Sequence, residues 1–192
     1  NDPERIAVLG AQVIEGLTTG SNDHFTMVVF EPKAAKSGMT LTPGQLAKID
    51  YAGGTPLKAA LSGTRPIFEG STRDPKVLVL LTDGTPTDAA SPAELAGLTP
   101  EDVSIFGISY FRDPAVRATA EQWLKPVSDE LTAVDPGSPD VVGQTLAAFT
   151  HGYARVLGSR PDTGSLGPGS AHVFQAGRFV EEVLVAVASR NV

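Results

Sequence analysis

The chain of 192 residues contains no cysteine, and this absence removes several chemistries at once. Without thiols there is no disulfide framework, no thiolate metal site and no cysteine nucleophile. The three histidines, His24, His151 and His172, have no partner at metal-ligand spacing, so a zinc site built on histidine is not expected. The missing cysteines leave the cellular compartment open, whether secreted, at the cell surface or cytoplasmic.

Basic clusters and long apolar runs are also missing. The formal net charge is -7 and the isoelectric point is about 4.9. An acidic chain without basic patches is not expected to bind nucleic acid. No apolar run approaches the roughly 20 residues of a membrane-spanning helix, so we expect no membrane insertion.

The most informative stretch that is present is a short apolar run with a polar end. Val77–Leu81 is uninterrupted by polar residues, which is typical of a parallel strand buried on both faces. It passes directly into Thr82, Asp83 and Gly84. Ligands of open α/β sheets bind outside the carboxyl ends of the strands, so Asp83 is a candidate site residue. A simple turn after the strand is the alternative interpretation of the same residues.

A second loop lies less than thirty residues upstream. Gly53-Gly54-Thr55-Pro56 directly precedes a helical pattern at Leu57, Ala60 and Leu61. The two glycines permit close backbone approach, and a Thr beside a Pro places a hydroxyl at the start of a helix.

These two loops, in this order, resemble the von Willebrand factor type A (vWA) domain over about residues 3–157. The family has a metal-ion-dependent adhesion site (MIDAS) made of three loops, and Thr55 and Asp83 match the second and third. The resemblance implies that Thr55 and Asp83 are Mg²⁺ ligands. It also implies that Gly54, Gly84, Thr85 and Asp88 lie near the site where a protein partner offers an acidic residue. For Asp88, a solvated loop position or a helix cap is the alternative.

The first metal loop of that family, Asp-x-Ser-x-Ser, has no counterpart upstream of Thr55. Three explanations are open: the sequence is a fragment, which we favour; the domain is degenerate and binds its partner without metal; or the first strand comes from the C-terminus. Laying residues 180–192 on the first strand puts Val187, Ser189 and Asn191 at the metal positions. Only Ser189 would then match the family.

The remaining patterns predict an α/β fold: a Rossmann-like open, mostly parallel sheet with one antiparallel edge strand, helices on both faces and a short C-terminal β extension. We expect a vWA-like domain at 1–157, a linker at 158–170 and the extension at 171–192, which either begins a second domain or adds back to the sheet. Expected helices are 3–17, a short piece from 42, 56–68, 92–98, 114–124 and 140–157; expected strands are 25–30, 34–41, 77–81, 103–109 and 131–134. On the helix at 114–124, Val116, Ala120 and Leu124 are expected to face inward.

Three classes of function are compatible with these patterns to different degrees. A binding module of adhesion type is the first. An enzyme is disfavoured, because the sequence carries neither a nucleophile motif nor a phosphate-binding glycine loop with its lysine. An accessory subunit of an ATPase or chaperone-type complex is the third, as some members of the family are.

Overall fold

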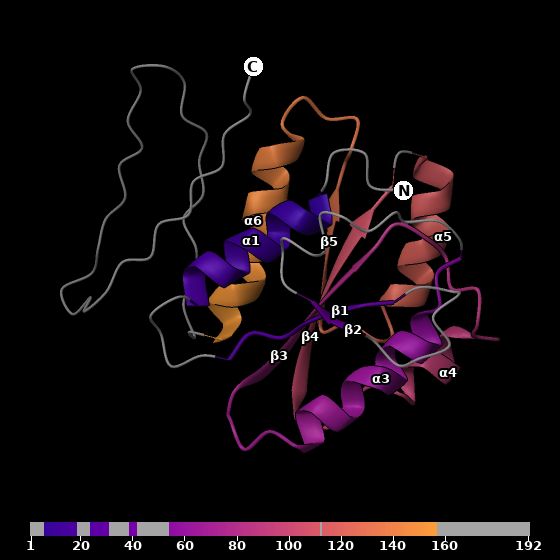
Figure 1. Ribbon diagram of the computed structural model, residues 1–192. Coiled ribbons are helices and arrows are strands. Elements are labelled where there is room, and N and C mark those ends of the chain that lie inside the picture. Colours follow the sequence, from indigo (N-terminus) through magenta and orange to yellow (C-terminus); the bar gives the residue numbers. More distant parts are fainter. Residues whose placement is uncertain (1–5, 19–23, 31–38, 42–53, 112, 157–192) are drawn as a thin grey trace.

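The computed structural model describes residues 6–18, 24–30, 39–41, 54–111 and 113–156 (Figure 1). Its helices are α1 (Ile6–Thr18), α3 (Leu57–Glu69), α4 (Pro92–Ala96), α5 (Pro114–Leu124) and α6 (Val141–Val156), and its strands are β1 (Met27–Val29), β2 (Met39–Leu41), β3 (Lys76–Thr82), β4 (Val103–Tyr110) and β5 (Glu130–Val134). The predicted helix at 42, the linker at 158–170 and the extension at 171–192 lie outside the described residues.

The centre of the fold is a parallel sheet in the order β3-β4-β5. Leu78 stands opposite Ile105 in the first pair, and Ile108 stands opposite Thr132 in the second. Each connection passes through a helix, as parallel neighbours require. The predicted α/β class with an open parallel sheet is therefore confirmed.

Helices cover both faces of this sheet (Figure 1). The first core cluster joins α1 and α6 to one face, and the second joins α3, α4 and α5 to the other. Side chains of β3 alternate between them: Leu78 and Leu80 belong to the second cluster, whereas Val79 and Leu81 pack on the first. Such two-sided burial explains why the strand is apolar without alternation.

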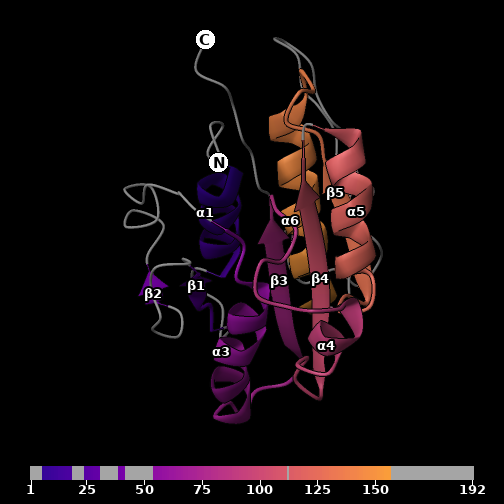
Figure 2. The same cartoon turned by 90° about the vertical axis from the view of Figure 1, so that its right-hand side faces the viewer.

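The strands β1 and β2 form a separate antiparallel pair, with Met27 opposite Leu41. This agrees with the expected hairpin, although residues 34–38 of the predicted edge strand lie outside the described part. Figure 2 shows β2, β1, β3 and β4 in that order across the molecule. No hydrogen-bonded ladder joins β1 to β3 among the described residues.

One expectation about packing is wrong. Val116 was expected to face inward from α5 together with Ala120 and Leu124, but its side chain is 42% exposed while the other two are buried. The whole first turn, residues 113–116, is exposed, since no described element extends over it. Periodicity gives the buried face of a helix but not how far along it the neighbouring element reaches.

Candidate functional site

The turn after β3 is closed by the last residue of the strand. Thr82 is buried, and its hydroxyl accepts a hydrogen bond from the Gly84 N–H (3.3 Å) and lies 3.2 Å from the Gly84 carbonyl oxygen, to which it can donate. This local ring directs the chain away from the sheet and leaves Asp83 exposed. The turn interpretation of Thr82-Asp83-Gly84 is therefore correct as local structure. It does not exclude a ligand role for Asp83, because turn geometry and an exposed carboxylate are compatible.

The loop before α3 is attached to the loop after β3. The carbonyl oxygen of Thr55 accepts hydrogen bonds from the N–H groups of Leu57 and Thr87, both at 2.9 Å. Thr55 also forms an isolated parallel bridge with Pro86. Two segments about thirty residues apart in the sequence are thereby fixed side by side at the carboxyl end of β3.

Two glycines let these loops come so close. A Cβ atom at position 84 would lie 2.0 Å from the Thr55 hydroxyl oxygen, and one at position 54 would lie 2.6 Å from that of Thr87. Neither position therefore has room for a side chain. The Thr55 hydroxyl lies against the turn that carries Asp83, so the structure places these two sequence-predicted residues on adjoining loops, with Thr85 on the same segment.

Asp88 has a structural partner of its own. Its two carboxylate oxygens accept hydrogen bonds from the N–H groups of Lys58 (3.0 Å) and Ala59 (2.9 Å), in the first turn of α3. The residue that precedes this helix, Pro56, supplies no side-chain cap. Asp88 therefore caps α3 from a distant loop, where its negative charge also suits the positive end of the helix dipole. Of the interpretations left open, the cap is the one these hydrogen bonds show.

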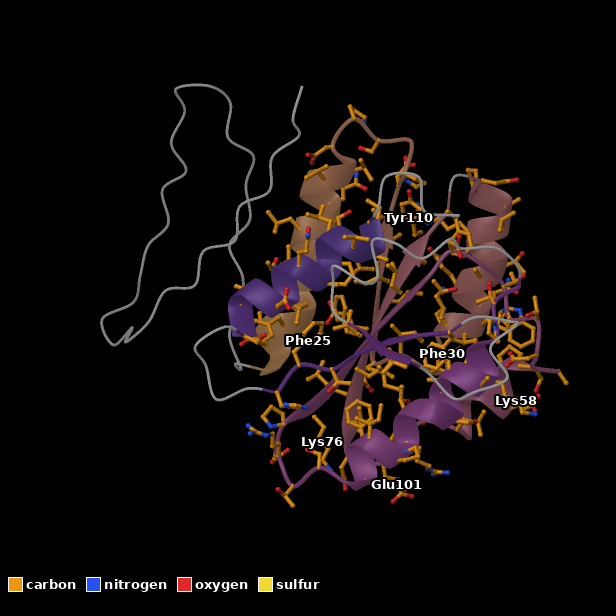
Figure 3. The ribbon with its side chains drawn as sticks, viewed as in Figure 1. Phe25, Phe30, Lys58, Lys76, Glu101 and Tyr110 are labelled. Atoms are coloured by element: carbon orange, nitrogen blue, oxygen red, sulfur yellow. The ribbon has the colours of Figure 1, made fainter. Side chains whose placement is uncertain are left out.

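Beside this cap lies an ion pair that the sequence did not predict. The Lys58 ammonium donates to the carboxylate of Glu94, which also accepts from the Ala90 N–H (2.7 Å). The hydrogen bond and charge of Lys58, with the Ala90 hydrogen bond, lower the pKa of Glu94, and Glu94 raises the pKa of Lys58. Figure 3 shows Lys58 at the end of α3 nearest α4.

A partial signal for this pair exists in the sequence. Ser91 and Glu94 have the spacing of a capping box, and the Ser91 hydroxyl accepts from the Glu94 N–H at 3.3 Å. The spacing predicts the start of α4, but it does not reveal that Lys58 approaches from α3.

His151 has partners away from this site. Its Nε2 lies 3.5 Å from the Glu130 carboxylate, and its ring lies 5.4 Å from that of Phe106. Glu130 begins β5, at the opposite end of the sheet from the loops of Thr55 and Asp83.

The side chains of Thr55 and Asp83 offer the type of ligand atom that Mg²⁺ prefers. Thr55 offers a hydroxyl and Asp83 a carboxylate, both hard oxygen ligands, and Mg²⁺ commonly binds through one or two carboxylates while keeping several waters. Asp88 is engaged with α3. No group of three or more His, Cys, Asp or Glu side chains suited to a metal occurs in the described part of the chain. Any binding through Thr55 and Asp83 alone would be weak.

Comparison of the chain with protein-family models, curated proteins and solved structures finds no match. The relation to the vWA domain is therefore a resemblance carried by the two loop motifs and their order. Within the described residues, no helix has the length and apolarity needed to cross a membrane.

Proposed function

We propose that this chain is a protein-binding module of vWA type that recognises its partner with the loop edge formed by residues 54–55 and 83–88. The carrying observation is the contact between the Thr55 hydroxyl and the turn at Gly84, which joins the two sequence motifs at the carboxyl end of a parallel strand. That position is where open α/β sheets present their ligand-binding groups.

Within this proposal, Thr55 and Asp83 are two of the ligands of a Mg²⁺ ion. When bound, the ion would supply a positive charge that accepts a carboxylate oxygen from the partner. Gly54 and Gly84 keep the two loops in contact, and Asp88 holds the same loop to α3 through its cap. Thr85 stands between Gly84 and Asp88, within reach of a partner that covers the edge.

Peptide display on the immobilised full chain tests the proposal, because a random library samples many possible partners at once. Selection in Mg²⁺ is expected to enrich peptides that contain Asp or Glu, and selection in EDTA is expected to lose them. Thr55→Ala and Asp83→Asn should lose the enrichment, whereas Glu101→Gln, a change at an exposed carboxylate beyond α4, should keep it. Identical selections with EDTA, or with Asp83→Asn, would contradict the proposal.

A titration with Mg²⁺ alone separates the ion from the partner. In nuclear magnetic resonance spectra we expect weak binding that shifts the amide signals of Gly84 and Thr85. Asp83→Asn should abolish these shifts. Asp88→Asn should keep them, because that carboxylate is used by the helix cap. If Mg²⁺ leaves the loop signals unmoved, Thr55 and Asp83 are not ligands in this chain.

A further inference from the structure

The segment between β3 and α4, residues 83–91, carries one half of the candidate site and is held at several successive positions. Near its start, Pro86 and Thr87 lie against Thr55. Ala89 then packs on the second core cluster. Figure 2 shows this segment crossing from the end of β3 to α4. An irregular segment keeps one conformation only where contacts of this kind hold it.

The far half of the segment is bound to α3 through two carboxylates. Asp88 accepts hydrogen bonds from two N–H groups in the first turn of α3. Glu94 accepts from the Ala90 N–H with one oxygen and from the Lys58 ammonium with the other. Lys58 is therefore held twice, at its backbone N–H by Asp88 and at its ammonium by Glu94. Residues 88–90 are thereby fastened against the start of α3.

Glu94 differs from an ordinary surface ion pair in the number of segments it joins. An exposed pair usually contributes little, because water screens it and two long side chains must be fixed. Arg117 and Glu121, with Nε and Oε1 2.8 Å apart, form a pair of that kind within α5. The Glu94 carboxylate instead connects the loop, α3 and α4, and its partner Lys58 lies 36 positions away in the sequence. Its loss would release a loop as well as a side chain.

We propose that Glu94 is a positioning residue of the Mg²⁺ site. By holding Ala90 to Lys58, it fixes the loop after β3 to α3. It thereby sets the separation of the two ligands, because Thr55 directly precedes α3 and Asp83 belongs to the loop. Two ligands from separate segments bind an ion better when no further ordering of the chain is needed on binding. The inference rests on the proposed function, since it concerns the same two ligands.

Amide exchange of the full chain without Mg²⁺, followed by nuclear magnetic resonance, tests the positioning. Glu94→Ala removes both contacts of the carboxylate and should raise exchange at residues 87–90 about three- to tenfold, the effect of losing one ordinary hydrogen bond. Lys58→Met removes the ammonium and should raise exchange less. Glu121→Ala, which breaks a pair of similar exposure in α5, should leave these amides unchanged. Protected amides in β4 show that each variant folds.

The effects of the two variants must also be coupled. In a chain that already carries Glu94→Ala, Lys58→Met should raise exchange no further, because both changes remove the same link. Additive effects would overturn the proposal, since Lys58 and Glu94 would then act separately. Glu94→Gln retains an oxygen that can accept from the Ala90 N–H, so it should restore part of the protection. General stabilisation of the fold would not give this local rescue.

A Mg²⁺ titration followed at the amide signals of Gly84 and Thr85 tests the consequence for the site. The Kd should rise about three- to tenfold in Glu94→Ala, the effect of ordering a freed segment on binding, and stay at the parent value in Glu121→Ala. Equal Kd values for the parent and Glu94→Ala would overturn the inference. If the parent binds no Mg²⁺ but exchange changes as expected, the proposed function fails and the fixing of the loop by Glu94 stands.

Discussion

Gly84 is the residue at which the turn after β3 meets the loop before α3, and its missing side chain sets their separation. Gly84→Ala would place a methyl group 2.0 Å from the Thr55 hydroxyl. We expect a loss of about 1–3 kcal/mol in the free energy of unfolding, the usual cost of forcing atoms into a filled site. Urea denaturation measures it.

Gly97→Ala is the matched control for this change. Gly97 has helical backbone angles and its nearest neighbour would be an ordinary 3.6 Å away, so a methyl group fits there. The substitution should be neutral or slightly stabilising, because alanine restricts the unfolded chain. If Gly84→Ala and Gly97→Ala changed the free energy of unfolding equally, the close contact with Thr55 would not be what makes position 84 intolerant of a side chain.

At the level of elements, the link between Lys58 and Glu94 joins α3 to α4 and makes stability depend on pH. The pKa of Glu94 is lowered from its ordinary 4.5, first by the Lys58 hydrogen bond and then by that of the Ala90 N–H. The ionised Glu94 carboxylate therefore stabilises the folded state above pH 4.5, and this stabilisation is lost as the pH falls through the lowered pKa. The pKa of Lys58 is raised above 10.5, mainly by its hydrogen bond with Glu94, so its contribution is lost only as the pH rises beyond that.

Glu94→Gln tests this dependence. At pH 7 the variant should be slightly less stable than the parent, and the difference should vanish in acid once Glu94 is protonated. Thermal unfolding between pH 2 and pH 7 measures the effect, with Glu101→Gln as the control. A difference that stays constant over this range would show that the charge of Glu94 does not act in the link. The effect should be small, since both side chains lie at the surface.

The contact between α1 and α6 depends on one glycine and not on its neighbour in the same helix. A Cβ at position 10 would lie 2.2 Å from the ring of Phe149, which is buried in the first cluster. A Cβ at position 16 would meet nothing within 4 Å. We expect Gly10→Ala to cost about 1–3 kcal/mol of unfolding free energy through overpacking.

Gly16→Ala, in contrast, should stabilise the chain by roughly 0.5–1 kcal/mol, because alanine is the better helix former. Chemical denaturation of the two variants against the parent checks both signs. The Tyr153 hydroxyl, 3.4 Å from the Leu17 carbonyl oxygen, fixes the same helix pair further along. If Gly10→Ala and Gly16→Ala lowered the free energy of unfolding equally, the sensitivity would lie in α1 itself and not in its contact with α6.

For the whole molecule, the described helices and strands follow largely from sequence periodicity. The helix 114–124 has the predicted bounds, and Val77–Leu81 is extended by one residue at each end. Apolar runs and helix starts at Asp113-Pro114 or Ser91-Pro92 are local signals, so they can be recognised without the fold. The exposure of Val116 depends on the extent of its neighbours, and no local pattern contains that information.

The candidate site was predictable only in part, for the same reason. The motifs around Thr55 and Asp83 indicated two loops at one sheet edge. The contact between Thr55 and Gly84, the cap that Asp88 provides for α3 and the approach of Lys58 to Glu94 join residues about thirty positions apart. Spacing along the chain does not specify such partners.

Whether the two core clusters unfold together can be tested with Trp123, the only tryptophan in the chain. It packs against the second cluster, whereas far-ultraviolet circular dichroism reports on helices around both. Because β3 and β4 contribute to both clusters, we expect the two signals to give the same urea midpoint, as in a two-state transition. Different midpoints would show that α1 and α6 unfold separately.

The edge of β3 that faces away from β4 has no ladder partner among the described residues, and this open edge bears on how the protein behaves at high concentration. An apolar strand with unpaired backbone groups can serve as a template for the same strand of another molecule, and Val77–Leu81 has no charge or proline to prevent this. Because the other edge of β3 is already paired with β4, such self-pairing would use the open edge of both molecules and stop at a dimer. Colloidal stability would then depend on whether that single edge is covered, in spite of a net charge of -7 that favours solubility.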